Sequence, residues 1–234
     1  MDPTLMPDIA APMPGDPIGW LEKIIVFPDG VSLLRLHPLS DYRRGEEEAG
    51  ILYLCRKFTG IQNDPGGYAF VMKIKVQVPK SEGGKADPLD GPSDRSMAEM
   101  QAMMKFRDAD LDCTPDLRWT LQQAQPGDGP VPGGYVTVIV MNQMPGSSLE
   151  ELKFWSLKEE EQNMIREKFS NNLRSVWKCG IVPTDCSMRN IFWDAKAQKC
   201  SIIGFERHRA MSPNVSQIDE AAIRGELPQW GLVQ

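Results

Sequence analysis

The sequence has no long apolar segment, only two histidines and few cysteines, and each of these absences excludes a class of protein. No run approaches the roughly 18 consecutive apolar residues that a membrane-spanning helix requires, so no membrane partner is expected. The five cysteines are odd in number and lack the spacing of metal ligands, which argues against a disulfide framework and a zinc site. The N-terminus carries Asp2, Asp8 and four prolines by Pro14, without the basic and apolar regions of a signal peptide. We therefore expect a cytoplasmic protein in a reducing compartment.

The composition is that of an ordinary globular domain, with 234 residues of which 41% are hydrophobic and 25% are charged. This length suffices for one domain with a substantial core, built as two lobes. The net charge of −6 disfavours non-specific binding to nucleic acid, and no DNA partner is expected. Scattered solubilising charge is the simpler interpretation of the basic residues. The alternative is a local basic face, formed if the fold gathers Lys73, Lys75, Lys80, Lys85, Arg189, Arg207, His208 and Arg209.

Hydrophobic periodicity and turn signals predict an α+β chain. Residues 1–17 are rich in Pro and Asp and are expected to form a flexible segment. Strands are predicted over 68–78 and 135–141, as a pair joined by a turn within 20–36, and as a hairpin from the runs 191–193 and 201–203. Residues 46–56 fit either a helix or a strand.

Helices are predicted over 93–106 and 156–178, with a further short helix over 216–223. In the first of these, Met97, Met100, Met103 and Met104 recur at helical spacing and are expected to face the core. In the long helix, Leu157, Ile165, Phe169, Leu173, Val176 and Trp177 recur near the same period.

Residues 180–206 hold the most informative motif of the chain. Asp185 and Asn190 lie five residues apart, which is the separation of the base and the second metal ligand in a kinase catalytic loop. A short apolar segment follows and ends in Gly204-Phe205-Glu206, at the place where a kinase carries Asp-Phe-Gly. Upstream, Lys73 lies within an apolar strand pattern and Glu99 within a helical one.

With its elements in this order, the chain resembles the protein-kinase-like fold, especially the small kinase-like and aminoglycoside-phosphotransferase-like proteins. The resemblance covers about residues 68–206 and includes a hinge-like segment, Val140–Gly146. It implies an α+β, small two-lobed protein-kinase-like fold with a truncated C-terminal lobe. Residues 18–234 would form the single domain, with 18–141 similar to an N-terminal lobe and 146–234 to a reduced C-terminal lobe.

The same resemblance implies a role for each residue of the motif. Lys73 would be the strand lysine and Glu99 its helix partner, while Asp185 would act as base and Asn190 as metal ligand. A buried lysine–glutamate pair beside an aspartate is a setting in which perturbed pKa values suit general acid–base catalysis. The alternative is that Asp185 only forms hydrogen bonds within its own loop. Cys186 is not expected to be a nucleophile, because no histidine is clearly placed to activate it.

Departures from the kinase pattern argue against phosphoryl transfer. Gly204 lacks the carboxylate that would bridge Mg²⁺ to the phosphates, and Pro183 replaces a histidine. No glycine-rich phosphate loop is evident within 20–60, and residues 207–234 are too few for the large helical subdomain of ordinary kinases. We therefore expect no metal and no cofactor, with Mg·ATP bound only by an atypical phosphotransferase. Glu206 lies two residues after the position of the kinase aspartate and is the one residue that could restore metal binding.

Three functions remain open for such a chain: an atypical small-molecule phosphotransferase, a catalytically dead pseudokinase that serves as a binding module, and a kinase-shaped enzyme recruited to another group transfer. For the third function, the chain is similar in size to the fungal arginine-containing cyclodipeptide synthases. That resemblance implies ATP-independent aminoacyl transfer from arginyl-tRNA and a second aminoacyl-tRNA, closing a diketopiperazine of secondary metabolism. We take this third function as the leading prediction.

The leading prediction gives catalytic roles to Asp185, Lys73 and Glu99. An acidic pocket from Asp185, Glu99 or Glu206 would hold an arginine guanidinium, or Asp185 would deprotonate the attacking amine. The residues expected to bind substrate, including tRNA phosphate, are Asn190, Glu206, Arg189, Arg207 and Arg209, with Lys73 also available to phosphate. The net charge of −6 counts against a tRNA partner, because such proteins usually show a basic face.

Overall fold

The computed structural model describes residues 16–58, 69–211 and 218–233. The chain divides into two compact units: residues up to 93 together with 118–142, and residues 94–117 together with those from 143 onward. Within the described ranges, no helix is both long and apolar enough to cross a membrane. Most of the N-terminal segment that was predicted to be flexible, residues 1–15, lies outside the described residues.

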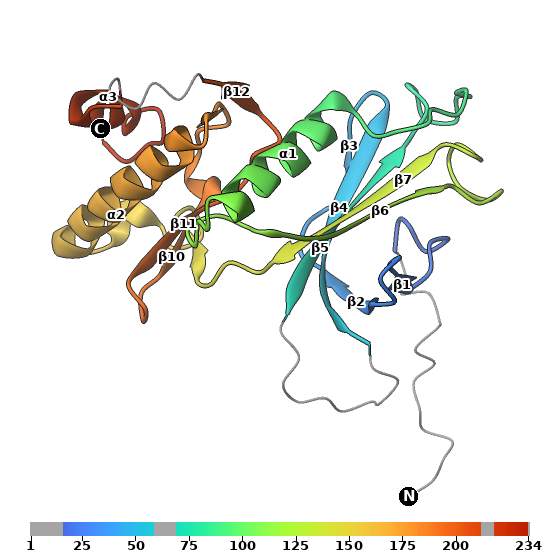
Figure 1. Cartoon of the computed structure of the whole chain (residues 1–234), viewed down its shortest axis with the longest axis horizontal. Helices are drawn as coiled ribbons and strands as arrows, with labels where there is room; N and C mark the ends of the chain where they lie inside the picture. The colour runs from blue at the N-terminus through green and yellow to red at the C-terminus, as the bar shows by residue number, and fades with distance from the viewer. Residues whose placement is uncertain (1–15, 59–68, 212–217, 234) are drawn as a thin grey trace, which may run out of the picture. The chain divides into compact units, whose positions relative to one another are not determined.

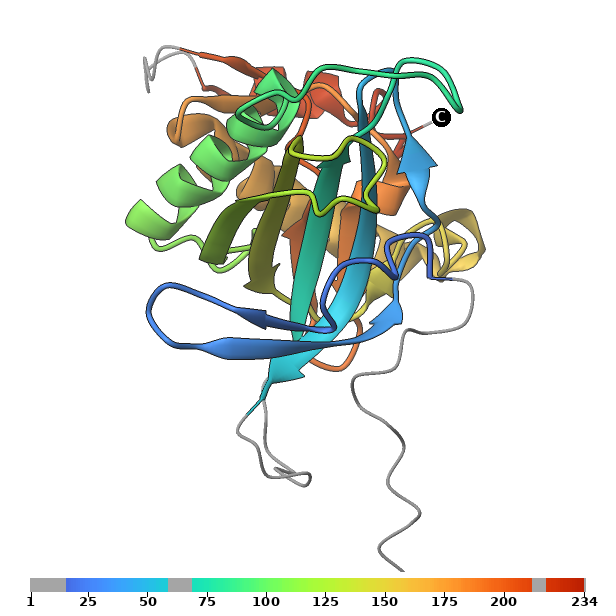
Figure 2. The same cartoon turned by 90° about the vertical axis from the view of Figure 1, so that its right-hand side faces the viewer.

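The first unit is built on a seven-stranded sheet, in which β4, β5 and β7 lie side by side (Figures 1 and 2). The spatial order is β1-β2-β4-β5-β7-β6, and β3 pairs with β4. Neighbours from β1 to β7 along this order are antiparallel. The strands are β1 Ile24–Val26, β2 Ser32–Pro38, β3 Arg43–Arg44, β4 Glu48–Lys57, β5 Phe70–Gln77, β6 Leu117–Ala124 and β7 Tyr135–Asn142.

Strand β5 lies in the middle of this sheet and is buried on both faces. Phe70, Met72, Ile74 and Val76 join the core of the first unit together with alternate residues of β7. Because successive side chains of a strand point to opposite faces, Lys73 belongs to the other face. It lies between β4 and β7 in the sheet and is only 8% exposed.

A buried ion pair fastens the start of the described chain to the sheet. The guanidinium of Arg35 lies 3.2 Å from the Asp16 carboxylate, and both side chains are almost fully buried. The Tyr53 hydroxyl donates to the other oxygen of the same carboxylate. These contacts satisfy an acid and a cation that would be costly to bury alone, and they fix the chain from Asp16 onward.

The second unit combines helices with two small sheets, of strand orders β11-β10-β8 and β12-β9. Its helices are α1 Asp94–Asp108, α2 Glu159–Lys178 and α3 Glu220–Glu226, with the 3₁₀ turns η1 Phe154–Ser156 and η2 Met188–Asn190. Its strands are β8 Ser147–Ser148, β9 Ile181–Pro183, β10 Ile191–Asp194, β11 Lys199–Ile202 and β12 His208–Ala210.

Helix α2 is held by one apolar stripe, at the helical spacing that the sequence predicts. Its buried side chains are Ile165, Phe169, Leu173, Val176 and Trp177. Three glutamates occupy its first turn and Lys178 its last, which complements the helix dipole at both ends. The helix stops before Gly180, whose positive φ of 75° suits a glycine and turns the chain into β9.

The α+β class is confirmed, and most predicted elements form where they were expected. The ambiguous segment 46–56 is the strand β4, and the runs 191–193 and 201–203 form the antiparallel hairpin β10–β11. Strand β6 was not predicted; it lies at the edge of its sheet, and half of its residues are polar and exposed. The short C-terminal helix begins at Glu220 rather than at 216, and residues 212–217 lie outside the described part of the chain.

The expected core face of α1 is partly wrong. Met97 and Met104 are 41% and 43% exposed, whereas Met103 is buried. The buried face instead consists of Ser96, Glu99, Ala102, Met103 and Phe106. Ala102 and Phe106 join the apolar core of the second unit, and this packing sets the rotation of the helix about its axis. Glu99 is thereby only 3% exposed.

Candidate functional site

The loop 184–190 joins β9 to β10 and carries Asp185 and Asn190. At its start, β9 pairs with β12, and the backbone N–H of Thr184 donates to the carbonyl oxygen of Arg207 at 3.0 Å. At its end, the turn η2 leads directly into β10. Sheet hydrogen bonds therefore hold the loop at both ends.

Asn190 closes this loop from the inside and is only 7% exposed. Its side-chain amide donates to the backbone carbonyl of Asp185 at 2.8 Å. Its own backbone N–H donates to the carbonyl of Ser187, and its carbonyl accepts from the N–H of Ile203, each at 2.9 Å. With these bonds Asn190 fixes the backbone of Asp185 and ties the loop to the end of β11.

Gly204 adopts a left-handed backbone conformation beside this amide, with a φ of 81°. A Cβ atom at residue 204 would lie 2.8 Å from Oδ1 and 2.9 Å from Cγ of Asn190. The place where a kinase carries its magnesium-binding carboxylate therefore holds no ligand, and the Asn190 amide fills the adjoining space. Among the described residues, no three His, Cys, Asp or Glu side chains gather as a metal site. Gly204 offers no side-chain ligand to a cation, and the absence of a bound metal stays a prediction.

Asp185 binds a guanidinium of its own loop. Nη2 of Arg189 donates to Oδ1 of Asp185 at 2.8 Å. The two side chains are half-exposed, at 48% for Arg189 and 34% for Asp185. The contact is a short charge-assisted bond at the surface, where solvent screens the attraction.

Phe205 anchors the segment that carries the remaining predicted site residues. Its ring packs edge-on against Phe106 at 4.5 Å between centroids, and the N–H of the His208 ring donates to its carbonyl at 3.0 Å. Arg207 and Arg209 are exposed; Arg207 directly precedes β12 and Arg209 lies within it. Thus the structure gathers Asp185, Arg189, Asn190, Glu206, Arg207 and Arg209 on the loop and the adjoining segment.

Glu226, at the end of α3, is a further acidic group of this site that sequence reasoning missed. Burial raises its pKa, against the opposing effect of the nearby Arg209. Burial also raises the pKa of the Cys186 thiol to about 11, and the charges of Glu226 and Asp185 add to this effect. Cys186 is therefore a protonated thiol at neutral pH, and its reactive thiolate is scarce there.

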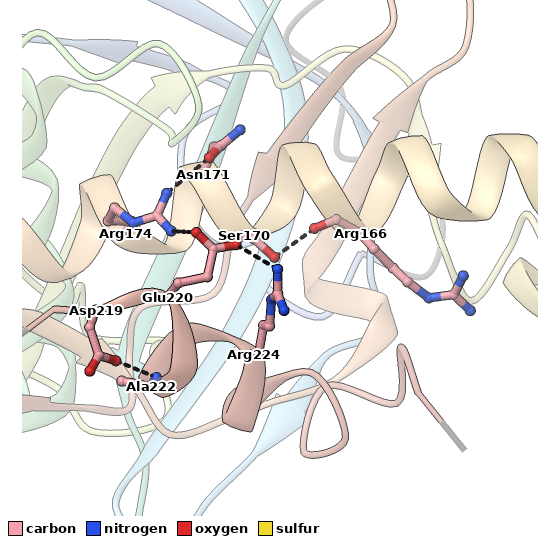
Figure 3. Close-up of polar contacts among 8 residues, drawn as sticks. All are labelled: Arg166, Ser170, Asn171, Arg174, Asp219, Glu220, Ala222 and Arg224. Atoms are coloured by element: carbon pink, nitrogen blue, oxygen red, sulfur yellow. Dashed lines mark hydrogen bonds and ion pairs between the residues drawn. The ribbon is translucent and has the colours of Figure 1, made fainter.

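Ion pairs of one carboxylate link α3 to α2 beside their apolar contacts, as Figure 3 shows for the ion pairs. Glu220 lies 3.5 Å from the guanidinium of Arg174 on α2 and 3.2 Å from that of Arg224 on its own helix. At the start of the helix, the Asp219 carboxylate accepts from the N–H of Ala222 at 2.7 Å and caps it. These contacts fix the helix whose last residue, Glu226, acts on Cys186.

The two other predicted catalytic residues are buried in different units. Lys73 belongs to the sheet of the first unit, and Glu99 to helix α1 of the second. Their pairing with each other, and their part in catalysis, stay predictions. All five cysteines are free thiols.

The comparisons with known proteins are consistent with a kinase-like architecture. No protein-family model matches the chain, and no curated protein matches its sequence. Among solved structures, it is similar to the kinase PK-1 of the Cydia pomonella granulovirus, with a TM-score of 0.50 and 17% identity. The match covers 76% of this chain and 52% of PK-1, so the chain spans about half the length of that kinase. At this identity the similarity shows the fold alone, which is protein-kinase-like.

Proposed function

We propose that this chain is a metal-independent transferase that joins aminoacyl groups delivered by tRNA and closes an arginine-containing cyclic dipeptide. The observation that carries the proposal is the 2.8 Å contact between Asp185 and Arg189. The carboxylate at the position of the kinase base already binds a guanidinium, which is the group that distinguishes an arginyl substrate.

The surroundings of Asp185 favour group transfer without a nucleotide. Gly204 supplies no carboxylate for magnesium, and the Asn190 amide fills the space beside it. Phosphoryl transfer depends on metal ions that neutralise the phosphates. An aminoacyl ester, in contrast, is already activated, because its alcohol leaves when an amine attacks the carbonyl carbon.

In the proposed reaction, the Asp185 carboxylate holds the guanidinium of the arginyl group and thereby positions its ester. The α-amine of one aminoacyl ester attacks the carbonyl carbon of the second. The new C–N bond forms, the C–O bond to one tRNA breaks, and the proton that the amine loses passes through water to the departing ribose oxygen. The free amine of the dipeptide then attacks the remaining ester in the same way, which closes the six-membered ring and releases the second tRNA. No oxidant or reductant is needed.

The exposed Arg207 and Arg209 are suited to the tRNA. Arg209 lies in β12, which pairs with the strand before Asp185, and the carbonyl of Arg207 accepts from the N–H of Thr184. Guanidinium groups bind phosphate in bidentate fashion, and such contacts position a nucleic acid without reading its sequence. Because the whole chain carries a charge of −6, this local pair would have to provide most of the attraction.

The same absence of a metal ligand at Gly204 favours a second candidate, a pseudokinase that binds a partner and has no turnover. An atypical phosphotransferase is the third candidate, and it requires Mg·ATP binding that Gly204 disfavours. Product formation separates the first candidate from the other two.

The test is mass spectrometry of small molecules from cells that express the chain, the Asp185→Asn variant or the Asp112→Asn variant. Asp112 also forms an exposed ion pair, at 2.9 Å to Lys199, so its substitution is a matched control outside the loop. We expect a new arginine-containing cyclic dipeptide from the native chain and from Asp112→Asn, and none from Asp185→Asn at equal protein level. No new product from the native chain would overturn the proposal in favour of the pseudokinase. Full product from Asp185→Asn would remove Asp185 from the mechanism.

A further inference from the structure

We infer that Arg189 is an internal ligand of Asp185, which occupies the place of the substrate's guanidinium and leaves when an arginyl group binds. The inference rests on the proposed function, because it assigns to Asp185 the recognition of arginine. It adds a residue that sets the affinity for this substrate without taking part in the chemistry.

The ion pair between Arg189 and Asp185 is not one of the contacts that hold the loop in its conformation. Nη2 of Arg189 meets Oδ1 of Asp185 at 2.8 Å. The bonds that hold the loop are others: the Asn190 amide on the Asp185 carbonyl, and the backbone bonds of Thr184 and Ile203. All of these remain when the Arg189 side chain moves away.

Exposure makes the Arg189 side chain easy to displace. It is 48% exposed, and the Asp185 side chain is 34% exposed, so water reaches both partners. Exposed ion pairs of this kind contribute little to stability, because solvent screens them and a long side chain must be held in one geometry. An incoming guanidinium replaces one such bond by a similar one and can add contacts of its own.

The backbone of Arg189 stays in place when an incoming guanidinium displaces its side chain. Its Cα lies in the turn η2, next to the buried Asn190, whose backbone and side-chain nitrogen are hydrogen-bonded. The long side chain can therefore rotate into solvent while the carboxylate of Asp185 keeps its position. The neutral thiol of Cys186, beside Asp185, offers no competing charge. The binding place is thus formed before the substrate arrives, which lowers the cost of binding.

The inference predicts that removal of Arg189 strengthens the binding of a free arginine ester. The probe is L-arginine methyl ester, titrated calorimetrically into the full chain, with L-lysine methyl ester for comparison. For Arg189→Ala we expect a dissociation constant about two- to fivefold lower than for the native chain, the amount by which an exposed ion pair competes. Lys199→Ala is the matched control, since Lys199 also forms an exposed ion pair, with Asp112 at 2.9 Å, and lies outside the loop. It should leave the binding unchanged.

Three outcomes would overturn the inference. Arg189→Ala could bind L-arginine methyl ester more weakly than the native chain does, or with the same dissociation constant. The third outcome is that no variant binds the ester. Binding that survives Asp185→Asn would overturn it as well, because the carboxylate would then not be the receptor. Urea denaturation of each variant shows whether it is folded, and Arg189→Gln repeats the test with a longer neutral side chain. The proposed function fails separately: tighter binding by Arg189→Ala without any cyclic dipeptide from cells would support the inference and refute the reaction.

Discussion

The side-chain amide of Asn190 fills the space into which a side chain at Gly204 would extend, at 2.8 Å from the position of its Cβ. In the kinase pattern these two positions hold the metal ion together. Here the amide nitrogen of Asn190 donates to the Asp185 carbonyl and its oxygen lies beside the glycine, so the amide supports the backbone of the loop.

The first prediction concerns Gly204→Asp, which restores the carboxylate of the kinase pattern. We expect it to lower the free energy of unfolding by about 1–2 kcal/mol, because residue 204 has a left-handed backbone. The required shift of the Asn190 amide would add to this cost. Urea denaturation at neutral pH measures the change.

The control for this variant is Gly225→Ala in α3, where a Cβ would meet nothing within 4 Å. Since alanine is the better helix former, the control should stabilise the chain by about 0.5–1 kcal/mol. If Gly204→Asp were as stable as the native chain, the Asn190 amide would have to move without a loss of stability. That outcome would contradict the role given to its hydrogen bond with the Asp185 carbonyl.

Local sequence signals were sufficient to predict much of the fold. The apolar and β-branched run of β5 reflects its central place in the sheet, the helical period of α2 reflects burial of one face, and both elements form as expected. Strand β6 was missed although Leu117, Trp119 and Leu121 alternate with exposed polar residues, because the alternation covers only six residues before the polar end of the strand. The face of α1 was misjudged because methionines at 97 and 104 fit a helical stripe as well as the residues that are buried. Only packing of Ala102 and Phe106 decides between them.

The candidate site was predictable only where it is local in sequence. The spacing of Asp185 and Asn190 identified the loop, and the structure adds the hydrogen bond that explains this spacing. Glu226 carries no motif, and it reaches Cys186 only through the docking of α3 on α2. The ion pair of Asp185 with Arg189 depends on the conformation of the turn η2, which the sequence pattern does not specify.

The second prediction concerns the pH dependence of stability. Burial raises the pKa of the Cys55 and Cys200 thiols from 9.0 to about 12. The folded chain therefore holds these protons more tightly than the unfolded chain. The contribution of each thiol is complete below about pH 9 and is lost as the pH rises from 9 to 12. Between pH 8 and pH 10 we expect a loss of about 1.4 kcal/mol for each thiol.

Urea denaturation at pH 8, 9 and 10 under reducing conditions measures this loss. Cys200→Ala should reduce the slope of stability against pH, whatever its effect on stability at pH 8. Cys179→Ala is the matched control, because that thiol is only partly buried and should leave most of the slope intact. An unchanged slope in Cys200→Ala would show that this thiol ionises as easily in the folded chain as in the unfolded one.

The last prediction tests whether α3 places Glu226 beside the loop of Asp185. Burial and the charges of Glu226 and Asp185 raise the pKa of Cys186 to about 11, so its reactive thiolate is scarce at pH 8. Glu226→Gln removes one of these charges, lowers the pKa of the thiol and should speed its alkylation a few-fold, since the thiolate fraction rises tenfold for each unit of pKa. Iodoacetamide labelling followed by site-resolved mass spectrometry gives the rate for Cys186 alone. Glu159→Gln, an exposed glutamate of the first turn of α2, is the control and should leave that rate unchanged. Equal rates in the native chain and Glu226→Gln would mean that the C-terminal helix does not contribute its carboxylate to the site.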